Sequence, residues 1–311
     1  KNGGLSLLRK EDESYVFEEI DVPGSVNCLY KDHFQDMVWI GTMGSGVYIY
    51  SLDMYSIKST CLSEYTSKIS QSVSALLVDE SNTLWAGTKG GGILRIYNYQ
   101  MEKIAGNHRV ELITASNSLL KDNVILSFGE SRQNGFWIGS EQGLSYFSQK
   151  ANRVSPIHVS WENKDVKSIT DIYEQDSIVW LSTLGMGMIK ATLQWHDNEP
   201  VLNAVKQLLV NEEDEFANHF LSIYSENDSI LWCANKGEGV FRLNTVTSTL
   251  ENIRFRGNTI NESNVIQKDN RGDYLIGTNA GLVKYTSEKR KLLDGSNGMP
   301  TSSVYAILAD S

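Results

Sequence analysis

The chain has 311 residues, of which 41% are hydrophobic, 21% are charged and only 4 are proline, which is the composition of an ordered globular protein. Its 28 basic and 38 acidic residues give a net charge of -10, so it lacks the cationic field that attracts a phosphate backbone, and we expect no contact with nucleic acid. No apolar stretch in the sequence approaches the roughly 20 residues that span a bilayer, and the first residues do not form a signal peptide.

A short motif recurs six times along the chain. Each copy has an apolar anchor, usually Trp, followed by small residues and a glycine turn. The anchors are Trp39, Trp85, Trp137, Trp180, Trp232 and Leu275. Their mean spacing of about 47 residues suits four short strands with their turns, which is one propeller blade. The sequence therefore predicts an all-β fold, a single β-propeller over residues 1–311.

Within each repeat we expect four strands in a fixed order. Strand A is an alternating apolar run such as residues 72–78, and it ends in a polar turn. Strand B carries the anchor, strand C follows the glycines, and strand D is the least regular. Strand A is expected to start near Ser25, Ser72, Asn123, Val166, His219, Ser263 and Ser303. Seven A strands predict seven blades.

The two ends of the chain predict one blade that is split between the termini. Residues 3–8 match the glycine turn and strand C, whereas residues 303–310 match strand A. Pairing of the first and last segments would close the ring and remove exposed sheet edges. The strand B that belongs between them is missing. We therefore expect either a fragment cut from a longer chain or a three-stranded closing blade.

The repeated residues themselves are predicted to be architectural. Alternation places Trp39 and Gly41 on one face of strand B, where a large side chain needs a small neighbour. The glycines at the end of strand B suit a tight turn with positive φ. A phosphate-binding interpretation of residues 89–92 is weaker, because no Gly-Lys-Ser/Thr and no following helix accompany it.

The motif Trp39-Ile-Gly-Thr, preceded by an apolar strand and a polar turn, resembles the two-component regulator propeller repeat. In that family, tandem propellers form the periplasmic sensor of a membrane-spanning hybrid histidine kinase of Bacteroidetes that detects glycans. The resemblance implies an oligosaccharide ligand, a homodimer, a neighbouring propeller or immunoglobulin-like domain, and no enzymatic activity in this domain itself. Three features depart from the family pattern, namely the missing strand B, Leu275 in place of Trp, and Asn235 in place of Thr.

Two other functions remain open. A propeller can be a protein-interaction scaffold, although the Gly-His and Trp-Asp signatures of the tryptophan-aspartate repeat are absent. A sialidase-like or lyase-like enzyme acting on polysaccharide is a second alternative, because the turns at residues 79–85 and 269–274 share an acidic residue and an aromatic with the Asp-box. The five histidines and three cysteines show no metal-binding or catalytic spacing, so we predict no metal, no cofactor and no catalytic residue.

A ligand is expected on the face formed by the turns from strand B to strand C and the connections from strand D to the next strand A. The predicted ligand-binding residues are Lys89, Asn123, Glu141, Trp161, His219, Asn235, Lys236, Glu238 and Asn279. Trp161 lies outside the anchor pattern and could stack on a sugar ring. The plainer interpretation of the polar residues is a set of solvated turns, and that of Trp161 is an aromatic covering a blade edge.

Overall fold

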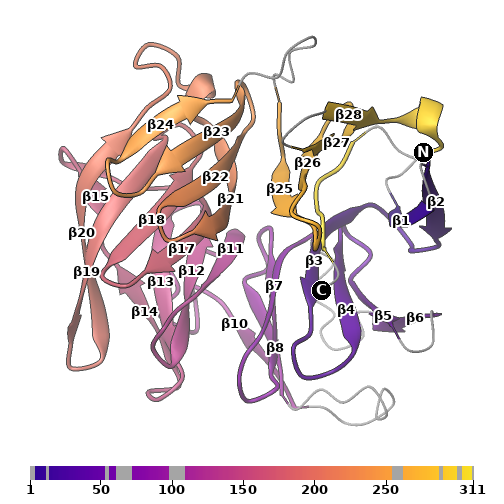
Figure 1. Ribbon diagram of the computed structural model, residues 1–311. Helices are drawn as coiled ribbons and strands as arrows, with labels where there is room; N and C mark the ends of the chain where they lie inside the picture. Colours follow the sequence, from indigo (N-terminus) through magenta and orange to yellow (C-terminus); the bar gives the residue numbers. More distant parts are fainter. Residues whose placement is uncertain are drawn as a thin grey trace.

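The computed structural model describes residues 4–11, 14–52, 56–60, 72–97, 109–253, 262–286, 290–299 and 303–309. These ranges form six four-stranded antiparallel sheets that follow one another along the chain, each one a propeller blade (Figure 1). Their helical content is two short 3-10 turns, η2 (Phe216–Asn218) and η3 (Gly295–Asn297). The prediction of an all-β propeller is confirmed.

Within each blade, strands A, B, C and D follow one another along the chain, and each strand pairs with the next. The first three blades are β3 (Val26–Lys31), β4 (Met37–Thr42), β5 (Val47–Ser51) and β6 (Ser56–Thr60); β7 (Val73–Val78), β8 (Leu84–Thr88), β9 (Ile93–Ile96) and β10 (Val110–Ile113); and β11 (Ile125–Glu130), β12 (Gly135–Ser140), β13 (Gly143–Ser148) and β14 (Arg153–Ile157). The next three are β17 (Ile169–Gln175), β18 (Ile178–Thr183), β19 (Met188–His196) and β20 (Glu199–Leu208); β21 (Phe220–Asn227), β22 (Ile230–Asn235), β23 (Gly239–Asn244) and β24 (Thr249–Asn252); and β25 (Val265–Lys268), β26 (Tyr274–Thr278), β27 (Gly281–Tyr285) and β28 (Arg290–Leu293). Two hairpins stand outside these sheets, β1 (Leu5–Glu11) with β2 (Ser14–Ile20), and β15 (Ser160–Trp161) with β16 (Lys164–Asp165).

The core lies between successive blades, because both faces of each sheet are apolar. The first strands of neighbouring blades contact one another in the order β3, β7, β11, β17, β21 and β25. The anchor Trp85 is fully buried, and its ring lies 4.9 Å from Phe136 and 4.4 Å from Phe147 of the following blade. A Cβ atom at Gly87 would stand 2.6 Å from Ile125 of that blade, so only glycine permits this approach. The anchors are therefore core residues, as predicted.

The acidic residues that end strand A have a structural partner in the anchors. The indole Nε1 of Trp39 donates a hydrogen bond to Asp32 at 3.0 Å, and that of Trp85 donates to Asp79 at 2.8 Å. In the sixth blade, where Leu275 replaces Trp, the ammonium group of Lys284 lies 2.7 Å from the corresponding Asp269 carboxylate. These Asp turns are accordingly part of the blade architecture, which accounts for their similarity to an Asp-box.

The prediction of seven blades is correct only in part. The described residues form six complete blades, and the seventh position holds the β1–β2 hairpin and an extended segment, residues 303–309, that belongs to no sheet. The hairpin lies between the last and the first blade in Figure 1. Val304 does occupy a strand A position, since its N–H donates to the Thr278 carbonyl at 2.9 Å as that of Ser263 donates to Asn235 at 3.0 Å one blade earlier. The physical reason is that no strand of the described ranges pairs with residues 303–309, and a strand A without a paired neighbour forms no ladder.

Candidate ligand-binding face

The predicted binding loops gather at one end of the blades. In each of three blades, the first residue after strand B donates its backbone N–H to a residue next to the start of strand A in the same blade. Lys89 bonds to Ser72 at 2.9 Å, Glu141 to Val124 at 3.1 Å and Lys236 to His219 at 2.9 Å. The turns from B to C and the connections from D to A therefore share one face.

Four predicted residues come together in the fifth blade, around η2. They are His219, Asn235, Lys236 and Glu238. Beside them stands Phe216, whose side chain is 47% exposed and whose ring centroid lies 5.0 Å from that of His219. The Lys236 Nζ lies 5.7 Å from the centre of the same ring. We call Phe216, His219 and Lys236 the Phe216 cluster.

Buried amides hold the Phe216 cluster in place. Asn218 is buried, and its Oδ1 accepts a hydrogen bond from the backbone of Val210 at 2.7 Å while its Nδ2 donates to the Asp214 carbonyl at 3.0 Å. These bonds close the acidic loop that precedes Phe216, so that the ring projects from a fixed backbone. A side chain held in advance loses little conformational entropy when a ligand binds.

Asn235 has a role in the turn itself. It has no exposed surface, its Nδ2 donates to the Ala217 carbonyl at 2.8 Å, and its Oδ1 accepts from the backbone of Gly237 and Glu238 at 2.9 and 2.8 Å. In other blades Thr takes this position, for example Thr88, whose hydroxyl donates to Gly92 at 2.8 Å. The longer amide reaches η2 as well, which explains why Asn replaces Thr in this blade.

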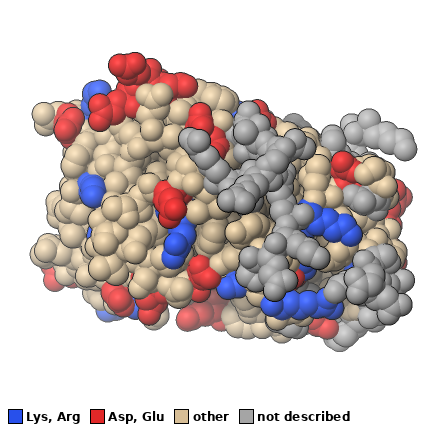
Figure 2. All heavy atoms as spheres, turned by 45° about the horizontal axis from the view of Figure 1, so that its top comes forward, with Lys and Arg blue, Asp and Glu red and all other residues tan. Residues whose placement is uncertain are grey.

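The electrostatics of the Phe216 cluster combine one cation with a neutral imidazole. Burial and then the nearby Lys236 charge lower the pKa of His219, against the opposing effect of Glu215 and Asp214. At pH 7 the imidazole is therefore neutral and offers one donor and one acceptor. Figure 2 shows acidic and basic side chains interspersed over the described surface of one face of the molecule.

The other predicted residues stand apart from this cluster. Lys89 and Glu141 are exposed, and Asn123 accepts hydrogen bonds from Gly90 and Ala115 at 3.0 and 2.8 Å. Asn279 is exposed and accepts from Asn264 at 3.0 Å. They lie at the turns of their own blades, so the structure distributes them around the face.

Trp161 lies at the outer rim of the propeller. It pairs with Lys164 in the β15–β16 hairpin, is half-buried, and belongs to a hairpin that packs against β20, the outermost strand of the fourth blade. Trp161 therefore helps to cover the outer edge of that blade.

Phe216 is the residue that sequence reasoning misses. The acidic run at residues 212–215 has the composition of a solvated loop, and the aromatic that follows it stands outside every repeat. The available signal is an aromatic outside the anchor pattern next to a polar loop, the same signal that marks Trp161.

Neither a metal site nor a membrane helix is found in the described ranges. They hold no group of three or more His, Cys, Asp or Glu side chains placed to bind a metal ion. Among them, no helix is both long enough and apolar enough to cross a bilayer.

Comparison with known proteins identifies the fold. No protein-family model matches the chain, and no curated protein matches it by sequence. Among solved structures, it is similar to the extracellular domain of a protein from B. thetaiotaomicron that is described as a putative hybrid two component system, with a TM-score of 0.68 and 13% identity over 92% of this chain and 37% of that one. A second such domain from the same organism gives a TM-score of 0.52 and 14% identity over 94% and 52% of the two chains. The WD40 β-propeller domain of Doa1 gives 0.61 and 10% over 98% and 88%.

The shared feature is the propeller fold. At these identities the likeness extends to the fold alone, because propellers with unrelated functions have similar backbones. The chain spans about a third to a half of the length of the two bacterial domains. Both of these bacterial neighbours are described as extracellular domains.

Proposed function

We propose that this propeller is a non-catalytic, extracytoplasmic sensor module of a hybrid two-component histidine kinase, and that it binds an oligosaccharide or helps a neighbouring domain to bind one. The Phe216 cluster carries the ligand part of the proposal. Its exposed aromatic ring stands 5.7 Å from a lysine ammonium and 5.0 Å from a neutral histidine ring on the face where propeller loops vary. The structural neighbours support the sensor part, since they are extracellular domains of two-component systems.

The chemistry of the Phe216 cluster suits a sugar. An aromatic ring gives an apolar surface for the C–H face of a pyranose, and the Phe216 side chain is 47% exposed. Lys236 donates hydrogen bonds, the neutral imidazole of His219 donates and accepts, and Glu238 at the same turn accepts. A hydroxyl-rich, uncharged ligand uses donors and acceptors together, whereas a nucleic acid would call for several cations.

The rest of the proposal concerns the assembly. We propose a periplasmic domain of an inner-membrane protein that forms a homodimer and works beside a further propeller or immunoglobulin-like domain. Binding would change the relative position of rigid bodies, since each blade is a packed unit that does not deform continuously. The kinase chemistry belongs to parts of such a protein other than this domain.

Calorimetry tests the ligand part of the proposal. The intact chain is titrated with a panel of oligosaccharide fragments, and the panel member that binds is repeated with Phe216→Ala. We expect at least a tenfold loss of affinity, about 1.4 kcal/mol, because the apolar contact is removed. Phe34→Ala is the matched control, since Phe34 is 53% exposed in a turn at the opposite end of the blades and should leave binding unchanged.

Three outcomes would contradict the proposal. Equal loss of affinity in both variants would move the site away from the Phe216 cluster. Hydrolysis or elimination of a polysaccharide by the purified domain would favour the alternative of a sialidase-like or lyase-like enzyme. A single stoichiometric protein partner without any sugar binding would favour the interaction scaffold.

A further inference from the structure

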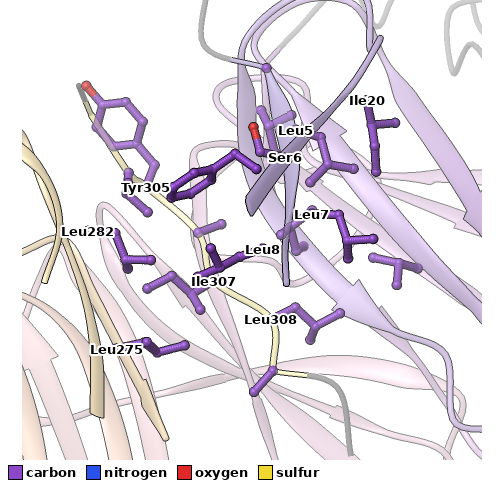
Figure 3. A pocket seen from close by; sticks show the side chains of 18 of the residues that line it. Leu5, Ser6, Leu7, Leu8, Ile20, Leu275, Leu282, Tyr305, Ile307 and Leu308 are labelled. Carbon is purple, nitrogen blue, oxygen red and sulfur yellow. The ribbon is translucent and has the colours of Figure 1, made fainter. Parts of the chain in front are cut away.

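A cavity of about 720 Å³ lies at the seventh blade position. Many of its walls are apolar side chains of β1, of residues 303–309, and of the blades on both sides (Figure 3), and the charged residues Lys31, Asp269, Arg271 and Lys284 also line it. Leu7 and Leu308 face it from the two chain ends, and Leu275 and Leu282 face it from the sixth blade. Two of its walls are the faces of the first and sixth blades that would pack against a complete seventh sheet. The cavity therefore lies where blade-to-blade interfaces would otherwise form.

Residues 303–309 lie where the strand A of a seventh blade would lie, so the cavity beside them is the place of its strand B. A Cβ atom at Gly277 would lie 2.9 Å from the Val304 Cγ1, just as one at Gly87 would lie 2.6 Å from Ile125 of the next blade. The sequence agrees, since residues 303–308 repeat the Ser-Val-x-Ala-aliphatic-Leu pattern of residues 72–77. This segment is therefore the strand A of the seventh blade.

Strand C is also present on the other side of the cavity. Gly4 is followed by the apolar residues Leu5 and Leu7 of β1, just as Gly46 and Gly92 directly precede the apolar strands β5 and β9. In the described part of the chain β1 pairs with β2 alone, and residues 303–309 belong to no ladder. Two strand edges thus lie on either side of a cavity lined largely by apolar side chains, which is the arrangement that accepts an added strand.

The complete blades give the register of the strand that would fit. Trp85 lies opposite Leu77 on one side and Arg95 on the other, and Gly87 lies opposite Ala75 and Ile93. At the seventh position, Leu308 corresponds to Leu77 and Leu7 corresponds to Arg95, so the anchor of an added strand would lie between Leu308 and Leu7. A small residue two positions later would lie between Ala306 and Leu5, which correspond to Ala75 and Ile93.

The same comparison shows where the anchor side chain would point. The ring of Trp85 packs on Phe136 and Phe147 of the next blade. The corresponding residues of the first blade are Val38 and Tyr50, which pair with each other as Phe136 and Phe147 do. Both Val38 and Tyr50 line the cavity.

We propose that this cavity is an acceptor site for one extended peptide strand that carries a large aromatic residue and, two positions later, a small one. The strand pairs antiparallel with β1 and with residues 303–309, buries its aromatic side chain against Val38 and Tyr50, and completes a four-stranded seventh blade. The proposal is independent of the sugar site, because it involves different residues at the junction of the two chain ends.

A peptide copied from the second blade provides the probe. Residues 82–90, Asn-Thr-Leu-Trp-Ala-Gly-Thr-Lys-Gly, are synthesised with a fluorescein label and titrated with the intact 311-residue chain by fluorescence anisotropy. We expect saturable binding, and at least tenfold weaker binding of the matched peptide with Trp85→Asp, because a charge replaces the buried indole. In the chain, Leu7→Lys should weaken binding, whereas Leu119→Lys, at a side chain that is 61% exposed, should not.

Photo-crosslinking keeps the proposal testable even where Leu7→Lys prevents folding. A peptide with benzoylphenylalanine at the position of Trp85 should crosslink to β4 or β5 at Val38 or Tyr50. Crosslinks to other blades, the absence of saturable binding, or a dimer of the chain that takes up no peptide would each overturn the proposal.

Discussion

The carboxylate of Asp171 links the packing of two blades to a protonation equilibrium. Asp171 in β17 is partly buried, and its Oδ2 accepts a hydrogen bond at 2.7 Å from the backbone of Ile223 in the next blade. Its Oδ1 accepts from Ile172 at 2.8 Å. Burial raises the pKa of Asp171 to about 6, although both backbone donors act in the opposite direction. The residue therefore joins two blades, and it holds its proton up to a higher pH than an ordinary aspartate does.

The shifted pKa of Asp171 predicts a pH dependence of stability. Because its pKa in the folded state exceeds the ordinary value of 3.8, its stabilising contribution is complete below about pH 4 and is lost as the pH rises to about 6. In Asp171→Asn, the change in the free energy of unfolding between pH 4 and pH 6.5 should differ from that of the wild type by about 2 kcal/mol. Urea denaturation at several pH values measures this difference.

Asp197→Asn is the control for the Asp171 experiment. Asp197 is exposed in a turn with a φ of 51°, a conformation that Asn tolerates equally well. Its pH profile should coincide with that of the wild type. The same profile for Asp171→Asn and the wild type would show that Asp171 titrates normally in the folded protein.

At the scale of the element, the turns from strand B to strand C fix each blade. Gly92 has a φ of +82°, a conformation that L-residues with a side chain rarely adopt. A Cβ atom there would also collide with the carbonyl oxygen of Ile113 in β10, the outer strand of the same blade. Gly44 occupies the turn of the first blade with a φ of +86°, and no atom lies within 4 Å of the place that a Cβ atom would take there. The two glycines share the backbone requirement but differ in the space around them.

This difference predicts unequal costs for two Gly→Ala substitutions. Gly44→Ala should reduce the free energy of unfolding by about 1 kcal/mol, because it adds only the cost of positive φ. Gly92→Ala should cost roughly 2–4 kcal/mol, since the backbone of β10 must also move. Chemical denaturation of both variants compares them directly. Equal costs would mean that β10 yields freely and that the contact with Ile113 does not matter.

For the whole molecule, the sequence predicts the features that recur in every blade, but it does not predict the structure of residues outside the repeat. Anchors such as Trp85 and glycines such as Gly87 recur with a period that is visible in the chain, so six blades and their core are predictable. The state of residues 303–309 is not, because a ladder depends on a partner strand rather than on local pattern. Phe216 escapes prediction for a related reason, since an exposed loop aromatic leaves no periodic signal. Asn235 resembles a free turn residue in the sequence because its contact with η2 is not local.

The open seventh position also predicts a gradient of protection around the ring. The blades β11–β14 and β17–β20 have packed neighbours on both faces, whereas β3–β6 and β25–β28 each have one face at the cavity. Local opening needs less free energy where fewer apolar contacts hold a segment. In hydrogen exchange followed by mass spectrometry, residues 303–309 and β1 should therefore exchange fastest among the described strands and strand-like segments, and β12 and β18 slowest. The difference should be roughly tenfold or more.

Adding the strand peptide of residues 82–90 separates an open ring from ordinary fraying of the chain ends. Filling the cavity should slow exchange in residues 303–309, in β1 and in the cavity-facing strands β4 and β26, because these gain a ladder or a packed face. Exchange in β12 and β18 should not change, since their neighbours stay the same. The Trp85→Asp peptide should slow none of them. Uniform protection around the ring without peptide, or peptide-induced slowing confined to β12 and β18, would show that the seventh position is not the weak point of the propeller.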